Sequence, residues 1–88
     1  MLNPVYTNKF KKDLKKIKNR KKDTNKLRAV MLELGENKGL APKYNDHKLS
    51  GNWEGRRECH VEPDWLLIYK IEGEFIIFER TGSHSDLF

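Results

Sequence analysis

Length, composition and charge exclude several classes of protein at the outset. The chain has 88 residues, of which 36% are hydrophobic and 35% charged, a balance typical of one small folded domain. No apolar run approaches the ~18 residues that a membrane span needs, and we expect no signal peptide, because the residues after Met1 show no apolar h-region. A single cysteine, Cys59, excludes an internal disulfide. We therefore expect residues 1–88 to form one domain that lies in the cytoplasm and binds no membrane.

Positive charge is concentrated in residues 9–28. They contain 11 Lys or Arg against Asp13 and Asp23, a net of +9, so the rest of the chain carries −4 of the total +5. A lysine-rich helix can simply present a solvated face. In so small a domain, however, this density favours a polyanionic partner such as nucleic acid.

The N-terminal part predicts an edge strand followed by two helices. Leu2–Tyr6 is short and apolar enough for an edge strand, even with a proline, and Thr7 is a suitable N-cap for the first helix. That helix should bury one stripe, formed by Phe10, Leu14 and Ile17. A second helix should run from about Thr24 to Gly35 or Gly39, with a buried stripe of Leu27, Val30, Met31 and Leu34.

The C-terminal part predicts a long loop and three strands. Residues 39–52 are rich in turn formers, which indicates a loop. From Trp53 onward the hydrophobic period becomes two, which predicts strands over about residues 53–61, 65–71 and 74–81. The order β-α-α-β-β-β indicates an α+β fold, in which two N-terminal helices pack on one face of an antiparallel meander sheet. The other face would then be free for function.

Alternation along the first of these strands separates its side chains into two sets. Cys59 and Val61 suit the core, so Glu58 and His60 should share the exposed face, where the carboxylate could tune the histidine. The alternative is a solvated surface pair. Because Cys59 and His60 are adjacent, their side chains diverge, which argues against a cysteine nucleophile.

The histidines all lie in the C-terminal half, among carboxylates and close to Arg80: His47, His60 and His84. Cleavage of RNA by its own 2′-hydroxyl needs a base, an acid and a cation for the phosphorane charge. Imidazoles suit the first two roles near neutral pH, and a guanidinium matches phosphate oxygens.

Other interpretations of these residues remain open from the pattern alone. The histidines with Glu58 or Asp64 could bind zinc, although they lack a spacing such as His-Glu-x-x-His. Trp65 could lie in the core or at a rim. Phe88 could be a frayed terminal residue or could stack on a base close to His84.

Two longer patterns resemble those of the YafQ branch of the RelE/ParE toxin superfamily. One runs from Asp46 to Tyr69 as Asp-His-x-Leu-x-Gly-x-Trp-x-Gly-x-Arg-x-x-His-x-x-x-Asp-Trp-Leu-Leu-Ile-Tyr. The other runs from Arg80 to Phe88 as Arg-Thr-Gly-Ser-His-x-x-Leu-Phe. The resemblance extends over essentially the whole chain and implies a RelE-like fold.

The resemblance implies a bacterial type II toxin that cuts mRNA in the ribosomal A site as an endoribonuclease, without a metal or another cofactor. It implies the following catalytic residues: His47, His60, Asp64, Arg80 and His84. It also implies that Trp65 and Phe88 help to place the substrate. Relatives carry Asp or Glu at the position of Glu58, so we expect this carboxylate to orient His60.

We therefore expect His60 and His84 to act as general base and acid, in an order that the sequence leaves open. His47 and Asp64 would support them or exchange protons. The basic helices would bind ribosomal RNA through phosphates, with contacts from Lys9, Lys12 and Lys16. The partners would be the ribosome, mRNA and a DinJ-like antitoxin that is acidic and partly disordered alone. The alternatives are a ParE-like poison of DNA gyrase and a non-catalytic RNA-binding module.

Overall fold

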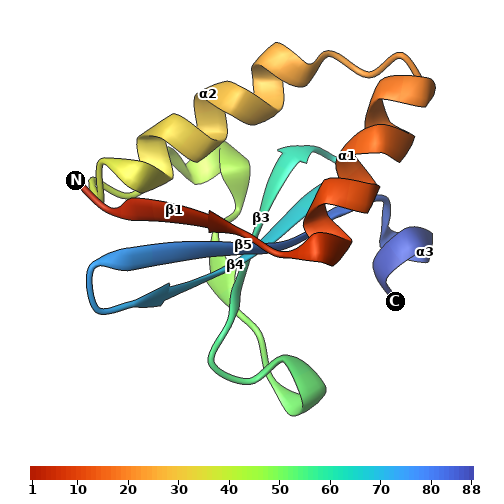
Figure 1. The fold of residues 1–88 in the computed structure, drawn as a ribbon. Coiled ribbons are helices and arrows are strands. Elements are labelled where there is room, and N and C mark those ends of the chain that lie inside the picture. The colour runs from red at the N-terminus through yellow and green to blue at the C-terminus, as the bar shows by residue number, and fades with distance from the viewer.

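In the computed structural model, which describes residues 1–88, strand β1 (Asn3–Tyr6) lies at one edge of the sheet (Figure 1). Helix α1 (Asn8–Asn19) begins directly after it, as the sequence predicts, because Thr7 caps the helix. The Thr7 hydroxyl accepts a hydrogen bond from the Phe10 backbone N–H at 3.0 Å and donates one to the carbonyl of Glu79 at 2.8 Å. The cap therefore starts the helix and also fastens it to the last strand.

Helices α1 and α2 (Thr24–Gly35) pack on one face of the sheet, where the main core lies (Figure 1). The predicted stripes are confirmed, although Leu14 and Met31 are only partly buried at the margin of the core. Asp23 caps α2 through the backbone N–H of Asn25. The core is completed by alternate residues of the sheet, among them Cys59, Leu67, Ile76 and Phe78.

The sheet has five strands in the order β1-β5-β4-β3-β2, with β3 at Arg57–Glu62, β4 at Trp65–Glu72 and β5 at Phe75–Gly82. Strands β3 to β5 form the predicted antiparallel meander, which the unpredicted β2 extends, but β1 pairs with β5 in parallel, so the sheet is mixed. The parallel pairing follows from the two-helix crossover, which returns the chain to the far edge of the meander. None of the helices is long and apolar enough to cross a membrane.

Two boundaries differ from the prediction. The predicted loop at residues 39–52 contains two 3-10 turns, Pro42–Tyr44 and Gly51–Trp53, and the short strand β2 (His47–Lys48). Strand β3 begins four residues later than expected, because the second turn extends through Trp53. A two-residue strand is too short to show a hydrophobic period, and pairing with β3 alone defines it.

The face opposite to α1 and α2, here called the second face, carries Glu58, His60, Leu66 and Ile68, and Arg80 lies at its β5 edge, where the guanidinium reaches Asp13 of α1. The sequence suggested that this face is free, but part of it is covered. Leu66 and Ile68 are fully buried beneath Leu87 of helix α3 (His84–Leu87), with Leu49 and Trp53 beside them. Strand β4 is apolar on both sides from Trp65 to Tyr69, so both of its faces must be covered.

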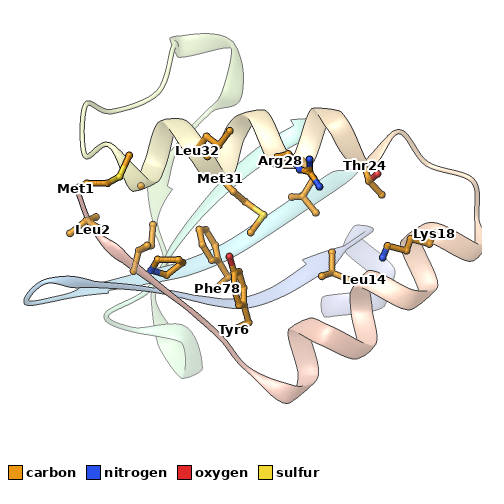
Figure 2. Close-up of a pocket in the computed structure, with 14 residues that line it drawn as sticks. Met1, Leu2, Tyr6, Leu14, Lys18, Thr24, Arg28, Met31, Leu32 and Phe78 are labelled. Atoms are coloured by element: carbon orange, nitrogen blue, oxygen red, sulfur yellow. The ribbon is translucent and has the colours of Figure 1, made fainter.

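An apolar groove of about 470 Å³ lies on the helix side, between β1 and the two helices (Figure 2). Most of its lining is hydrophobic and includes Met1, Leu2, Tyr6, Leu14, Met31 and Leu32. None of the residues singled out for catalysis lines this groove. Chemistry is therefore expected away from this groove, on the second face.

Candidate active site

Strand register brings the candidate residues into two rows across the second face. One row joins His47, Glu58, Ile68 and Arg80 through directly paired positions on β2, β3, β4 and β5. The next row joins His60, Leu66 and Gly82, two residues before His84. Because neighbouring strands lie about 4.8 Å apart, Glu58 and Arg80 are separated by about 10 Å, the scale of a nucleotide-sized substrate.

Glu58 lies beneath two histidines. Its Oε1 is 3.4 Å from Nε2 of His47 and 3.6 Å from Nε2 of His60, and the two imidazole centroids are 6.2 Å apart. The prediction that Glu58 is exposed is wrong, because its residue exposure is only 4%. Pairing on both sides, with β2 and β4, removes this carboxylate from solvent and directs it to the histidines.

Backbone carbonyls fix the tautomers of both histidines. The carbonyl of Asn45 is 2.7 Å from Nδ1 of His47, and that of Pro63 is 3.1 Å from Nδ1 of His60. A carbonyl only accepts hydrogen bonds, so each Nδ1 carries a proton and donates it. The Nε2 atoms are therefore the nitrogens that can exchange protons, and both face the carboxylate of Glu58.

Asp46 holds β2 in this position. Its Oδ1 accepts hydrogen bonds from the Tyr69 hydroxyl at 2.7 Å and from Nε of Arg57 at 3.3 Å.

His60 also lines a polar hollow of about 420 Å³, together with Lys26 and Lys43. Glu62 lines the same hollow and pairs with Lys26 at 2.9 Å, so Lys43 is the cation here that no carboxylate of the chain engages.

Arg80 is held by a carboxylate that the sequence analysis missed. Its Nε and Nη2 donate to the two oxygens of Asp13 at 2.7 and 3.1 Å. These hydrogen bonds raise the pKa of Arg80 further above its usual range, so the guanidinium stays charged. Only one edge of the guanidinium is engaged, which leaves the N–H donors of Nη1 for a phosphate.

The turn between β3 and β4 contacts two histidines. Its Pro63 carbonyl holds His60, and the neighbouring Asp64 accepts a hydrogen bond from the His84 backbone N–H at 3.0 Å. His84 is the first residue of α3, and its side chain is exposed. The structure thus brings Asp64 to the N-terminus of α3, where a carboxylate is favourable.

The two aromatic residues that the resemblance assigns to substrate placement lie in different environments. Phe88 is 57% exposed, with its ring centroid 5.2 Å from that of His84 and 6.3 Å from that of Trp53. Trp65 is only 1% exposed, and its Nε1 donates to the Thr81 hydroxyl at 3.0 Å. A ring with this burial cannot stack on a base, so we assign Trp65 to the core instead of a direct substrate contact.

The structure also places the lysines expected to contact RNA and the single cysteine. Lys9, Lys12 and Lys16 are exposed on α1, and no intramolecular ion pair engages them. Burial raises the pKa of the Cys59 thiol to about 12, which keeps it protonated and unsuited to nucleophilic attack. No group of three or more His, Cys, Asp or Glu side chains is arranged so that it could hold a metal ion.

The missed carboxylate had a signal in the sequence. Asp13 is the only acidic residue of α1, and it lies three residues after Phe10 and four before Ile17, within the apolar stripe. A charged residue at a stripe position indicates a buried partner. The partner itself is 67 residues away in the sequence, so no local pattern identifies it.

The fold and the second face define an α+β domain in which histidines, carboxylates and an arginine from strands β2 to β5 and helix α3 lie on one side of the sheet or at its edge. The model of a family described as "bacterial toxin of type II toxin-antitoxin system, YafQ" matches residues 2–88. The chain belongs to this YafQ family of bacterial type II toxins.

Relatives of known name share most of the chain. The mRNA interferase toxin YafQ of Escherichia coli K12 is 48% identical over 84 residues, which are 94% of this chain and 91% of that protein. The crystal structure of the E. coli DinJ–YafQ toxin–antitoxin complex matches with a TM-score of 0.91 at 44% identity, covering 99% and 97% of the two chains. A metal-bound toxin from Helicobacter pylori matches with a TM-score of 0.93 at 42% identity over the full length of both chains. The RelE-like fold is thereby confirmed.

Proposed function

We propose that this toxin is an mRNA interferase, a ribosome-dependent endoribonuclease that inhibits translation. The observation that carries the proposal is the arrangement of the second face. His47 and His60, each of fixed tautomer, and the charged Arg80 lie in adjacent rows there. The name of the E. coli relative, an mRNA interferase toxin, supports the same activity. We further propose a cytoplasmic location, where ribosomes and mRNA are found.

The reaction needs only the RNA and side chains of this face. One histidine takes the proton of a 2′-hydroxyl, whose oxygen forms a bond to the adjacent phosphorus. The bond from phosphorus to the 5′-oxygen breaks, and the other histidine gives that oxygen a proton. Arg80 stabilises the added negative charge of the phosphorane. The products are a 2′,3′-cyclic phosphate, or the 3′-phosphate formed from it, and a 5′-hydroxyl. We assign the two proton transfers to His60 and His84, with support from His47, Glu58 and Asp64.

The ribosome would supply what the open face lacks. His47 and His60 lie on one side of the apolar cluster around Leu87, and Arg80 lies on strand β5 beyond it. An external scaffold that holds mRNA across the cluster would align the attacking and leaving oxygens. Exposed lysines of α1, among them Lys9, Lys12 and Lys16, would bind ribosomal RNA phosphates, so binding should weaken as salt rises.

We propose an acidic, DinJ-like antitoxin as the protein partner, because the E. coli relative has been crystallised with DinJ and the chain here is strongly basic. We also propose that cleavage needs no metal. The metal-bound H. pylori relative makes this point worth testing directly. Toxin that has been stripped with EDTA and then freed of the chelator should cleave ribosome-bound mRNA in Mg²⁺ buffer as fast as toxin preloaded with Zn²⁺ or Cu²⁺, whereas a loss on stripping that Zn²⁺ or Cu²⁺ restores would contradict metal independence.

Mapping of RNA ends in a translating extract tests the activity. The wild-type toxin should cut ribosome-bound mRNA and leave 5′-hydroxyl ends, whereas His84→Ala and Arg80→Ala should reduce cleavage by about 100-fold or more. Glu36→Gln is the matched control, because it removes a carboxylate from an exposed ion pair with Lys38 away from the site. Full activity of both site variants would favour a non-catalytic RNA-binding module. DNA damage without mRNA cleavage would favour the gyrase alternative.

A further inference from the structure

Asp13 is an exception on helix α1. The helix carries six lysines and one acidic residue, yet this residue is only 4% exposed. Its carboxylate accepts hydrogen bonds from Nε and Nη2 of Arg80 and, at 3.1 Å, from the backbone N–H of Thr81. Burial of a carboxylate is costly unless it is paired and hydrogen-bonded, and these contacts meet that requirement.

The contacts of Asp13 determine where Arg80 points. A bidentate pair fixes the plane of the guanidinium, which a single point contact would not. The Thr81 hydroxyl continues the network, since it donates to the Leu66 carbonyl at 2.8 Å and accepts from Trp65. Asp13 is therefore held by Thr81 of β5 as well as by its own helix, and from this fixed position it orients the guanidinium of Arg80.

The other end of the same helix holds α3. Arg20, the C-cap of α1, donates from Nη1 and Nη2 to the two oxygens of Asp86 at 2.6 and 3.0 Å. Asp86 also accepts from the Ser83 backbone N–H at 2.9 Å, within the capping box that starts α3 at His84. The pair thus ties the turn that carries His84 to α1.

We propose that α1 is the positioning element of the active site, with Asp13 as a positioning residue for Arg80 and Arg20 as one for His84 through Asp86. The inference rests on the proposed function, in which Arg80 and His84 act on the RNA. It assigns a role to two residues of the lysine-rich helix that do not themselves contact the substrate.

The variant Asp13→Asn tests whether Asp13 positions Arg80. An amide keeps the volume and one acceptor, but its N–H groups face the donors of Arg80, so the bidentate pair is lost. We expect kcat for mRNA cleavage to fall about 10- to 100-fold while KM changes little. The Arg80 Nε–H signal in NMR spectra should also lose its protection from solvent exchange. Glu36→Gln, which removes a carboxylate from an exposed ion pair with Lys38 away from the site, should leave both measurements unchanged.

A double-mutant cycle separates positioning from a merely structural role. If Asp13 acts through Arg80, then Asp13→Asn should cost no further activity in an Arg80→Ala background. Additive losses would overturn the inference, as would full activity of Asp13→Asn beside an inactive Arg80→Ala variant. Full activity of Arg80→Ala would instead overturn the role of Arg80 in the proposed function.

The variant Arg20→Ala tests the second half and decides the inference if Asp13→Asn does not fold, because the Arg20–Asp86 pair is exposed and its loss leaves the core intact. We expect kcat to fall about 10-fold, with no further loss in a His84→Ala background. Lys38→Ala is the matched control, since Lys38 loses an exposed ion pair with Glu36. Equal activity of Arg20→Ala and Lys38→Ala would overturn this half.

Discussion

The two faces of the sheet bury their side chains in different ways. On the helix side, Phe10, Ile17, Leu27 and other residues of α1 and α2 form one continuous core with the sheet. On the second face, only Leu66, Ile68 and Leu87 form a buried cluster, and polar residues surround it. Stability is therefore concentrated on one face, which leaves the other free to hold partly exposed histidines and an arginine.

The largest loss of stability should come from a substitution in the core on the helix side. Phe10→Ala removes a fully buried ring that packs against Phe78, and we expect it to lower the free energy of unfolding by about 3–5 kcal/mol. Phe88→Ala is the matched change on the second face and should leave stability almost unchanged while it lowers cleavage. Urea titration and cleavage assays check both; equal stabilities would remove the distinction between the faces.

A smaller effect is expected from the cluster on the second face. Leu87→Ala should lower the free energy of unfolding by about 2 kcal/mol and should also lower cleavage, because Leu87 packs α3 and its His84 onto the sheet. Leu32→Ala, in the exposed part of the apolar groove, should change neither property. The comparison fails if Leu87→Ala unfolds more easily but cleaves RNA at the wild-type rate.

The pH dependence of stability should report the contact between α1 and α3. Hydrogen bonds from Arg20, then those from Ser83, hold the pKa of Asp86 well below its usual range. A depressed pKa in the folded state adds stability above the unfolded pKa of about 4, and this stability is lost as the pH falls. The Tm of Asp86→Asn should therefore fall less between pH 5 and 3 (about one unit on either side of that pKa) than the wild-type Tm. An equal fall in Tm for the wild type and Asp86→Asn would contradict a stabilising contact between Arg20 and Asp86.

Treatment with a thiol reagent, which targets Cys59, should have the smallest effect on the native protein. The thiol is fully buried on the helix side and its pKa is raised to about 12, so a thiol reagent at neutral pH should not modify the native protein. Modification should appear only with unfolding in urea, and cleavage should survive incubation with the reagent. Rapid labelling of the native toxin would show that this part of the core opens.

The sequence predicted the elements that have their own period or cap. The Phe10 stripe, the Thr7 cap and the alternation of Cys59 and Val61 are local patterns, and each is present in the structure. The parallel pairing of β1 with β5 and the strand β2 were missed, because pairing across the sheet leaves no period in the sequence.

The site was predicted by residue type and less well by environment. Resemblance and chemistry selected the histidines and Arg80, but not the burial of Glu58 between β2 and β4 or of Trp65 in the core. The contacts of Asp13 and Arg20 join residues more than 60 positions apart. Such contacts depend on how helices pack on the sheet, which a single sequence does not encode locally.

The parallel pair at the edge of the sheet has a consequence for synthesis of the toxin. Strand β1 has β5 as its only strand neighbour, from Asn3 beside Phe75 to Tyr6 beside Phe78. The helix layer and the arginine clamp therefore cannot assemble until residues 75–82 have left the ribosome. A nascent chain that ends before residue 75 lacks β5 and Arg80, so it has no strand to pair with β1 and no arginine to pair with Asp13.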